Sequence, residues 1–251
     1  MPRYFLEVSY TGSSYSGFQV QENANSVQEE VEKAFGIFFR KRISMTGASR
    51  TDTGVHAWQN FFHFDMDEEF PGRAVYNINA ILPADIAINH LYSVGSEAHC
   101  RYDAESRVYH YFILQKKNPF LKDRAHFYPF RLNPECLAHA AEIVSEFEDF
   151  SSFSKRNTQA KTTVCQVMES RWVERDGCLV YEVRANRFLR GMVRGLVGTM
   201  LLVGTGKLSL DMFRAVIEAR DCTRADFSVP GHGLFLMEVR YPKGLLGAIL
   251  Y

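Results

Sequence analysis

The spacing of apolar residues along the first half of the chain predicts a mixture of strands and helices. Apolar and other residues alternate over residues 3–10, as in a β-strand. Ser26 and Glu29 have the spacing of a capping box, and the apolar positions after them recur at helical intervals as far as Arg40. The further elements expected here are a short β-prone segment at 43–46, a strand at 60–64, a helix at 74–82 and a strand at 86–91.

The second half shows the same mixture of patterns. Asn133 and Pro134 are residues that favour the first positions of a helix. Asp176-Gly177 is a hairpin turn sequence between two strand-like runs. The elements expected here are a strand at 107–114, a helix from 133, hairpin strands at 164–173 and 178–185, a largely buried helix at 188–203, a helix at 209–218 and a strand at 234–241.

Strands mixed with helices predict the α+β class, with helices packed on one face of mainly antiparallel sheets. At about 150 residues per domain, a length of 251 fits one large domain or two smaller ones. We divide the chain into an N-terminal half, 1–104, and a C-terminal half, 105–251. Residues 116–124 are the best candidate for a segment that crosses between halves.

Composition narrows the class of protein further. Hydrophobic residues make up 46% and charged residues 23%, which is typical of a globular protein and argues against intrinsic disorder. The five cysteines are widely spaced without a Cys-x-x-Cys pair, so we expect reduced thiols. Neither a signal peptide nor an apolar run of about 18 residues is present, so no membrane span is expected.

The net charge is zero, with 29 Lys and Arg against 29 Asp and Glu. Binding to nucleic acid requires basic residues, so this balance argues weakly against such a partner. A balanced total can still hide a basic cleft, because the distribution over the surface decides. The local basic groups are 40–42, 116–117 and 155–156, each of which is more commonly a solvated turn or helix end.

Candidate chemistry is concentrated in the loop at 47–56, which holds Arg50, Asp52 and His56 between two glycines. A guanidinium keeps a neighbouring carboxylate ionised, so Asp52 is a candidate nucleophile, base or metal ligand. The alternative is a surface turn with an Arg50–Asp52 ion pair. A metal site lacks a third ligand with suitable spacing, and a serine hydrolase lacks its Gly-x-Ser-x-Gly motif.

At this loop the chain becomes similar to a known family. Residues 47–57, Gly-Ala-Ser-Arg-Thr-Asp-Thr-Gly-Val-His-Ala, closely resemble the signature loop of the tRNA pseudouridine synthase A family. This chain departs from the family's usual residues at Phe18, Ser49 and Thr53. Seven other blocks resemble family motifs in the same order, at 10–19, 26–29, 79–86, 107–111, 149–153, 186–194 and 233–236.

The resemblance implies a pseudouridine synthase fold of two similar halves with a catalytic cleft between them. By resemblance, Asp52 is the catalytic carboxylate and Arg194 is its cationic partner. Tyr109 matches the tyrosine that stacks on the target base, and Arg50 matches the arginine that enters the RNA stem. Leu234 is expected to contact the edge of the base.

The family isomerises uridine to pseudouridine in the anticodon stem-loop of tRNA, at positions 38, 39 and 40. The reaction needs no cofactor, and the sequence has no dinucleotide or P-loop motif. The resemblance therefore implies tRNA as partner, a homodimer, a cytoplasmic location and neither a metal nor a small-molecule cofactor. The alternatives are an isomerase acting on another RNA, a non-catalytic RNA-binding protein and a metal-dependent hydrolase, which a chelator would inactivate.

Overall fold

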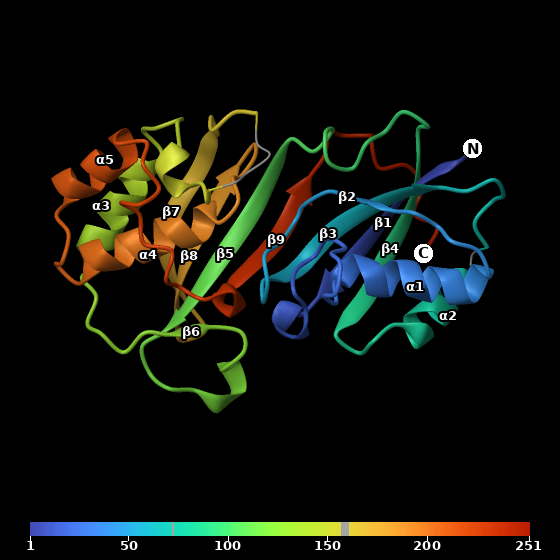
Figure 1. Ribbon diagram of the computed structural model, residues 1–251, viewed down its shortest axis with the longest axis horizontal. Helices are drawn as coiled ribbons and strands as arrows, with labels where there is room; N and C mark the ends of the chain where they lie inside the picture. Colours follow the sequence, from blue (N-terminus) through green and yellow to red (C-terminus); the bar gives the residue numbers. More distant parts are fainter. Residues whose placement is uncertain (72, 157–160) are drawn as a thin grey trace. The chain divides into compact units, whose positions relative to one another are not determined.

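The computed structural model describes residues 1–71, 73–156 and 161–251, which form two compact units. Unit 1 comprises Met1–Glu105 together with Leu236–Tyr251, and unit 2 comprises Ser106–Phe235. Each unit combines mainly antiparallel strands with helices, which confirms the predicted α+β class (Figure 1).

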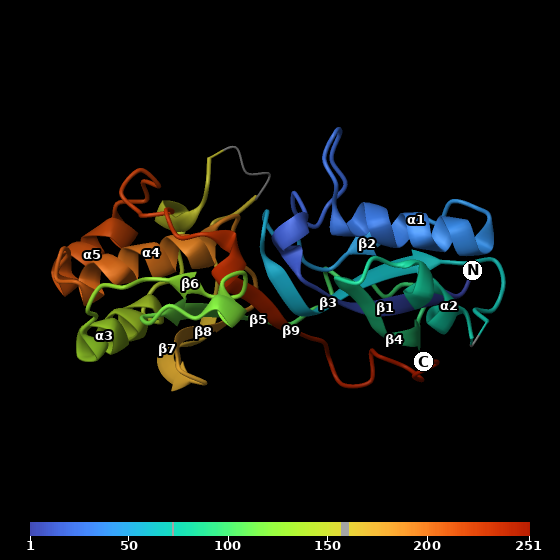
Figure 2. The same cartoon turned by 90° about the horizontal axis from the view of Figure 1, so that it is seen from below.

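Unit 1 contains a sheet in the order β4-β1-β3-β9, and β2 pairs with β3. Both β3 and β4 run antiparallel to β1. Helices α1 and α2 pack against each other, and α1 covers the sheet through a T-shaped contact between Phe35 and Phe64 at 5.3 Å (Figure 2). The elements are β1 (Arg3–Tyr10), η1 (Gly12–Ser14), α1 (Val27–Phe39), β2 (Thr46–Gly47), β3 (His56–Asp65), α2 (Ala74–Ile81), β4 (Ile86–Val94) and β9 (Leu234–Arg240). The first two residues of β9 belong to unit 2.

The sequence signals of unit 1 agree with this structure. The Ser26 side chain accepts a hydrogen bond from the Glu29 N–H at 3.3 Å, so the predicted cap starts α1. The helix ends at Arg40, which adopts a left-handed conformation. Strand β3 begins at His56 rather than at residue 60. The fully buried aromatic side chains of this core are Tyr4, Phe5, Phe18, Phe35, Phe61, Phe62 and Phe64.

Unit 2 contains the antiparallel order β5-β8-β7, and the short β6 runs parallel to β5. Helix α3 packs on β7 and α4 on β5, and α5 contacts both helices (Figure 2). The elements are β5 (Ser106–Leu114), η2 (Pro119–Leu121), β6 (His126–Phe127), α3 (Pro134–Val144), η3 (Ser151–Phe153), β7 (Val167–Arg175), β8 (Cys178–Ala185), α4 (Met192–Gly204), α5 (Leu210–Glu218) and η4 (Gly231–Gly233).

Two predictions in unit 2 concern backbone conformation. The turn between β7 and β8 has positive φ angles of 51° at Asp176 and 75° at Gly177, as the predicted hairpin requires. Helix α4 was expected to begin at Phe188, which is wrong. It begins at Met192 because Gly191 has a φ of 77°, which interrupts helical geometry just before it.

The C-terminal segment belongs to unit 1, whereas the sequence patterns placed residues 236–251 in the C-terminal half. Strand β9 lies beside β3, and the Leu250 N–H donates to the Leu91 carbonyl at 2.8 Å. These are long-range contacts that local sequence patterns do not reveal. Residues 116–124, considered above as a crossing between halves, lie within unit 2.

The structure also bears on the cysteines and on membrane-spanning helices. All five cysteines are free thiols, three of them buried and two half-buried. Among the described residues, no helix is both long enough and apolar enough to cross a membrane.

Candidate active site

Asp52 lies half-buried in the loop that joins β2 to β3. The backbone on both sides of it is fixed. The Phe18 N–H donates to the Thr51 carbonyl at 3.1 Å, and the Val55 N–H donates to the Asp52 carbonyl at 3.1 Å. Gly54 closes this turn with a φ of 76°. The carboxylate is therefore carried by a loop of defined shape.

A buried polar network holds the residue just before Asp52. The hydroxyl groups of Tyr10 and Thr51 are 2.8 Å apart. The Asn60 amide donates to the Tyr10 hydroxyl at 3.3 Å and to the Ser49 carbonyl at 3.0 Å. Burial raises the pKa of Tyr10 to about 12, so its hydroxyl stays protonated at neutral pH. The network thus ties the loop to both β1 and β3.

Two glycines let the segment after β1 approach the same loop. A Cβ atom at Gly12 would lie 2.0 Å from the Val55 carbonyl oxygen. A Cβ at Gly17, where φ is 122°, would lie 3.1 Å from the Thr51 carbonyl oxygen. The Gly12 N–H also donates to Nδ1 of His56 at 3.1 Å, and His56 is only 1% exposed. His56 therefore anchors the loop in unit 1.

The polar network was not predicted from the sequence. The available signal was Asn60, a polar residue inside an otherwise apolar strand. A buried asparagine needs partners for its amide, so its presence there predicts a hydrogen-bonded structural role.

Arg50 is exposed on the same loop. Burial and the charge of Arg101 lower the pKa of Arg50, and Tyr102 acts in the opposite direction. The Arg101 guanidinium lies over the Tyr102 ring at 5.8 Å from its centroid. Two guanidinium groups near each other form a surface suited to anions.

In unit 2, Tyr109 lies on β5 opposite Val183 of β8 and is 8% exposed. Its ring meets that of Phe188 edge to face, with the centroids 4.9 Å apart. Phe188 lies just before α4, in a segment that the sequence pattern predicted to be part of the helix. Its packing fixes the plane of the Tyr109 ring from one side.

Arg194 is half-buried on α4 and donates from Nε to the Val229 carbonyl at 2.8 Å. The Tyr111 hydroxyl donates to the next carbonyl, that of Pro230, at 2.8 Å. Burial raises the pKa of Tyr111, and the positive charge of Arg194 opposes that shift. Leu234 follows four residues later and is buried. The segment 229–234 thus accepts hydrogen bonds from Arg194 and Tyr111 and contains Leu234.

The predicted site residues are divided between the units. Asp52 and Arg50 belong to unit 1, whereas Tyr109, Arg194 and Leu234 belong to unit 2.

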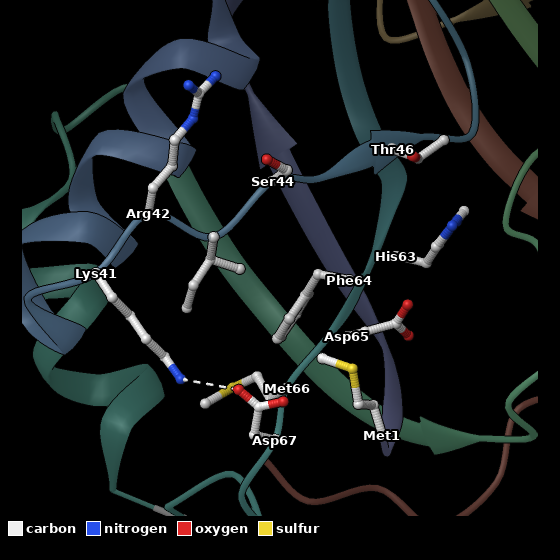
Figure 3. A pocket seen from close by; sticks show the side chains of 11 residues that line it. Met1, Lys41, Arg42, Ser44, Thr46, His63, Phe64, Asp65, Met66 and Asp67 are labelled. Atoms are coloured by element: carbon white, nitrogen blue, oxygen red, sulfur yellow. Dashed lines mark ion pairs between the residues drawn. The ribbon is translucent and has the colours of Figure 1, made fainter.

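A pocket of about 310 Å³ lies in unit 1, between the segment after α1 and the strands β2 and β3 (Figure 3). Lys41 forms an ion pair with Asp67 at 3.9 Å across its lower part. His63 and Thr46 line the side of the pocket opposite Lys41. The basic residues 41–42 therefore border a pocket that is distinct in position from the Asp52 loop.

His63 belongs to a cluster with His99 and Cys100, whose ligand-type atoms lie within 4.8 Å of one another. Burial lowers the pKa of His63 to about 4, so its ring is neutral at pH 7. The Cys100 N–H donates to Nδ1 of His63 at 3.3 Å, and the N–H groups of Arg101 and Tyr102 donate to Nδ1 of His99. These ring nitrogens already serve as hydrogen-bond acceptors, which gives the cluster a structural explanation.

The model of the tRNA pseudouridine synthase family matches this chain over residues 7–103 and 147–242. The chain belongs to this family, as the motifs of the sequence predicted. Curated relatives with the name tRNA pseudouridine synthase A include proteins from Parabacteroides distasonis and Porphyromonas gingivalis. The first is 43% identical over 248 residues, which is 98% of each chain. The second is 42% identical over 250 residues, which is 98% of this chain and 99% of the relative.

The similarity extends to more distant bacteria. A tRNA pseudouridine synthase A from Bacillus subtilis is 36% identical over 239 residues, covering 93% of this chain and 97% of the relative.

Proposed function

We propose that this chain isomerises uridine to pseudouridine in the anticodon stem-loop of tRNA, at positions 38, 39 and 40. The observation that carries the proposal is the Asp52 loop. It has the family's signature sequence, and a buried network tied to β1 and β3 fixes the residue beside the carboxylate. A carboxylate carried by a backbone of fixed shape is what a reaction with a single catalytic acidic group requires.

The isomerisation breaks the N1–C1′ bond of uridine and forms a C5–C1′ bond. C5 loses a proton and N1 gains one, so the atoms balance without a redox partner or group donor. Asp52 acts either as a nucleophile or as a base on the ribose. Both roles require an ionised carboxylate, and Arg194 is proposed as the cation that keeps it ionised. The bond from Arg194 to the Val229 carbonyl supports this role because it fixes the guanidinium.

Tyr109 is proposed to stack on the target base. A base outside its helix needs an aromatic surface, and Phe188 supports the Tyr109 ring from its edge. Arg50 is proposed to enter the RNA stem and hold the base out, which agrees with its exposure and its position beside Arg101. Leu234 is proposed to contact the edge of the base.

The remaining parts of the proposal follow from the family. The substrate is tRNA, the enzyme acts as a homodimer in the cytoplasm, and no metal or small-molecule cofactor takes part. A dimer collects basic residues from two chains, which reconciles zero net charge with RNA binding.

The test is pseudouridine mapping on unmodified tRNA transcripts with the wild type, Asp52→Asn and Asp67→Asn. Asp67 is a matched control, because its carboxylate is 72% exposed and lies in unit 1 outside the loop. We expect product in the anticodon arm from the wild type and Asp67→Asn, and none from Asp52→Asn.

Other outcomes would replace the proposal. Product in a different RNA but in no tRNA would indicate an isomerase of another substrate. Tight tRNA binding without any product would indicate a non-catalytic RNA-binding protein.

A further inference from the structure

Residues 116–131 of unit 2, here called the basic–aromatic loop, concentrate charge in a chain that is neutral as a whole. The loop contains five basic residues and one acidic residue, a net charge of 5 − 1 = +4. It lies between the two stretches that the family model matches, 7–103 and 147–242. None of the residues that received a role in the proposed function lies in this loop. Its basic residues are all exposed, namely Lys116, Lys117, Lys122, Arg124 and Arg131.

Three phenylalanines of the loop are also exposed. Phe120 is 89% exposed, Phe127 is 45% and Phe130 is 56%. Lys207 places its ammonium group 5.7 Å from the centre of the Phe130 ring. A ring as exposed as that of Phe120 costs free energy in water and adds little to the core, so three exposed rings within one loop favour a binding surface.

The exposure of Phe120 does not arise from a loosely held segment. The Asn118 side chain accepts the Phe120 N–H at 3.0 Å and starts the short helix η2. Leu121, the next residue, packs on a buried cluster that includes Leu114 and Ala125. Strand β6 then pairs with β5, and the Tyr128 N–H donates to the Leu114 carbonyl at 2.8 Å. The loop is therefore anchored with the Phe120 ring facing solvent.

We infer that the basic–aromatic loop binds unpaired nucleotides of the substrate RNA, at a contact additional to the target uridine. The inference rests on the proposed function for the identity of the RNA as tRNA. Exposed aromatic faces stack on bases, and neighbouring lysines and arginines neutralise phosphates. Proteins that bind single-stranded nucleic acid use this combination of aromatic and basic groups.

A second copy of the chain is the competing occupant. A two-fold symmetric contact centred on this loop would bring a charge of +4 against +4. Such a contact is disfavoured by charge, whereas an RNA backbone is complementary to it. The observations thus favour RNA.

The first experiment compares tRNA binding by Phe120→Ala, Phe120→Trp and Tyr76→Ala. Tyr76 is a matched control, since it is 70% exposed on α2 in unit 1. Loss of one base stack is expected to raise the Kd of Phe120→Ala about tenfold, with Phe120→Trp and Tyr76→Ala near the wild type. The rate of pseudouridine formation at saturating tRNA should stay within about twofold for all three, because the loop takes no part in bond changes.

The second experiment addresses charge. Replacing Lys116 and Lys117 with Gln should reduce the slope of log K against log salt by roughly 1 for each phosphate that is no longer neutralised. Lys33→Gln is the control, because Lys33 is exposed on α1. An unchanged slope together with an unchanged Kd for Phe120→Ala would overturn the inference.

The outcomes separate this inference from the proposed function. A wild type that makes no pseudouridine contradicts the function, whatever the loop does. An active wild type whose loop variants bind tRNA normally contradicts only the inference. Sedimentation velocity supplies the last outcome, since a Phe120→Ala variant that dissociates into monomers would make this surface an interface between copies.

Discussion

Replacing Tyr10 with phenylalanine removes one hydroxyl from the network that holds the Asp52 loop. The change deletes the 2.8 Å bond to Thr51 and the 3.3 Å bond from Asn60, and both partners stay buried. A buried group that loses its partner costs about 1–3 kcal/mol. Asn60 keeps its bond to the Ser49 carbonyl, which limits the damage. We expect a loss of about 2 kcal/mol in the free energy of unfolding and a Tm lower by roughly 4–8 °C.

The same change should affect the reaction. Thr51 precedes Asp52, the proposed catalytic carboxylate, and a displacement of about 1 Å at a catalytic group can cost about 100-fold in rate. Partial loosening of the loop should therefore lower the single-turnover rate of Tyr10→Phe by about tenfold at saturating tRNA, with tRNA affinity little changed.

The matched control is Tyr4→Phe. Tyr4 lies on the same strand, is 2% exposed and accepts the Phe70 N–H at 3.1 Å, away from the Asp52 loop. Tyr4→Phe should lose stability but keep the wild-type rate. The reasoning is refuted if the two variants lose rate equally, or if Tyr10→Phe loses stability while keeping its rate.

Three further outcomes are expected. Gly12→Ala places a Cβ 2.0 Å from a backbone oxygen and should destabilise the protein by about 3 kcal/mol or more, whereas Gly95→Ala has open space around it; equal Tm values would contradict this. Burial lowers the pKa of His63 to about 4, so between pH 4 and 6.5 the unfolded chain binds more protons than the folded chain. The free energy of unfolding is therefore highest above pH 6.5 and falls as the pH is lowered to 4, by on the order of 1–2 kcal/mol after allowance for solvent screening. Urea unfolding of His63→Gln should therefore depend less on pH than that of the wild type or of the exposed His139→Gln, and an unchanged dependence would count against the reasoning. Finally, EDTA should leave the rate on a stem-loop folded in monovalent salt unchanged, and a loss that zinc restores would assign a metal to the His–Cys cluster.

Elements with strong local signals were predicted from sequence. The Ser26 side chain caps α1, and Asp176-Gly177 supplies the two positive φ angles of its hairpin, because both effects act over a few residues. The start of α4 was misplaced, since the apolar pattern continues through Phe188 and gives no sign of the left-handed Gly191. A conformation of one residue overrode the periodicity.

Contacts between distant residues were beyond the sequence patterns. The signature loop identified Asp52 and Arg50 by resemblance, but the support from Tyr10 depends on a partner 41 residues away. Arg101 and Tyr102 beside Arg50 were missed for the same reason. The roles of all five residues, Asp52, Arg50, Tyr109, Arg194 and Leu234, remain predictions that activity measurements must test.

The division of the chain has a consequence for its synthesis. Unit 2 is continuous, whereas unit 1 is interrupted and gains β9 only after residues 106–235 have been made. During synthesis, all of unit 2 therefore leaves the ribosome before β9 is available. Strand β3, which follows the Asp52 loop, can pair with β9 only after that. Until then the part of the β3 edge that β2 does not cover is unpaired, which is a site for aggregation. A nascent chain of this protein should therefore depend more on chaperones than one whose units are consecutive.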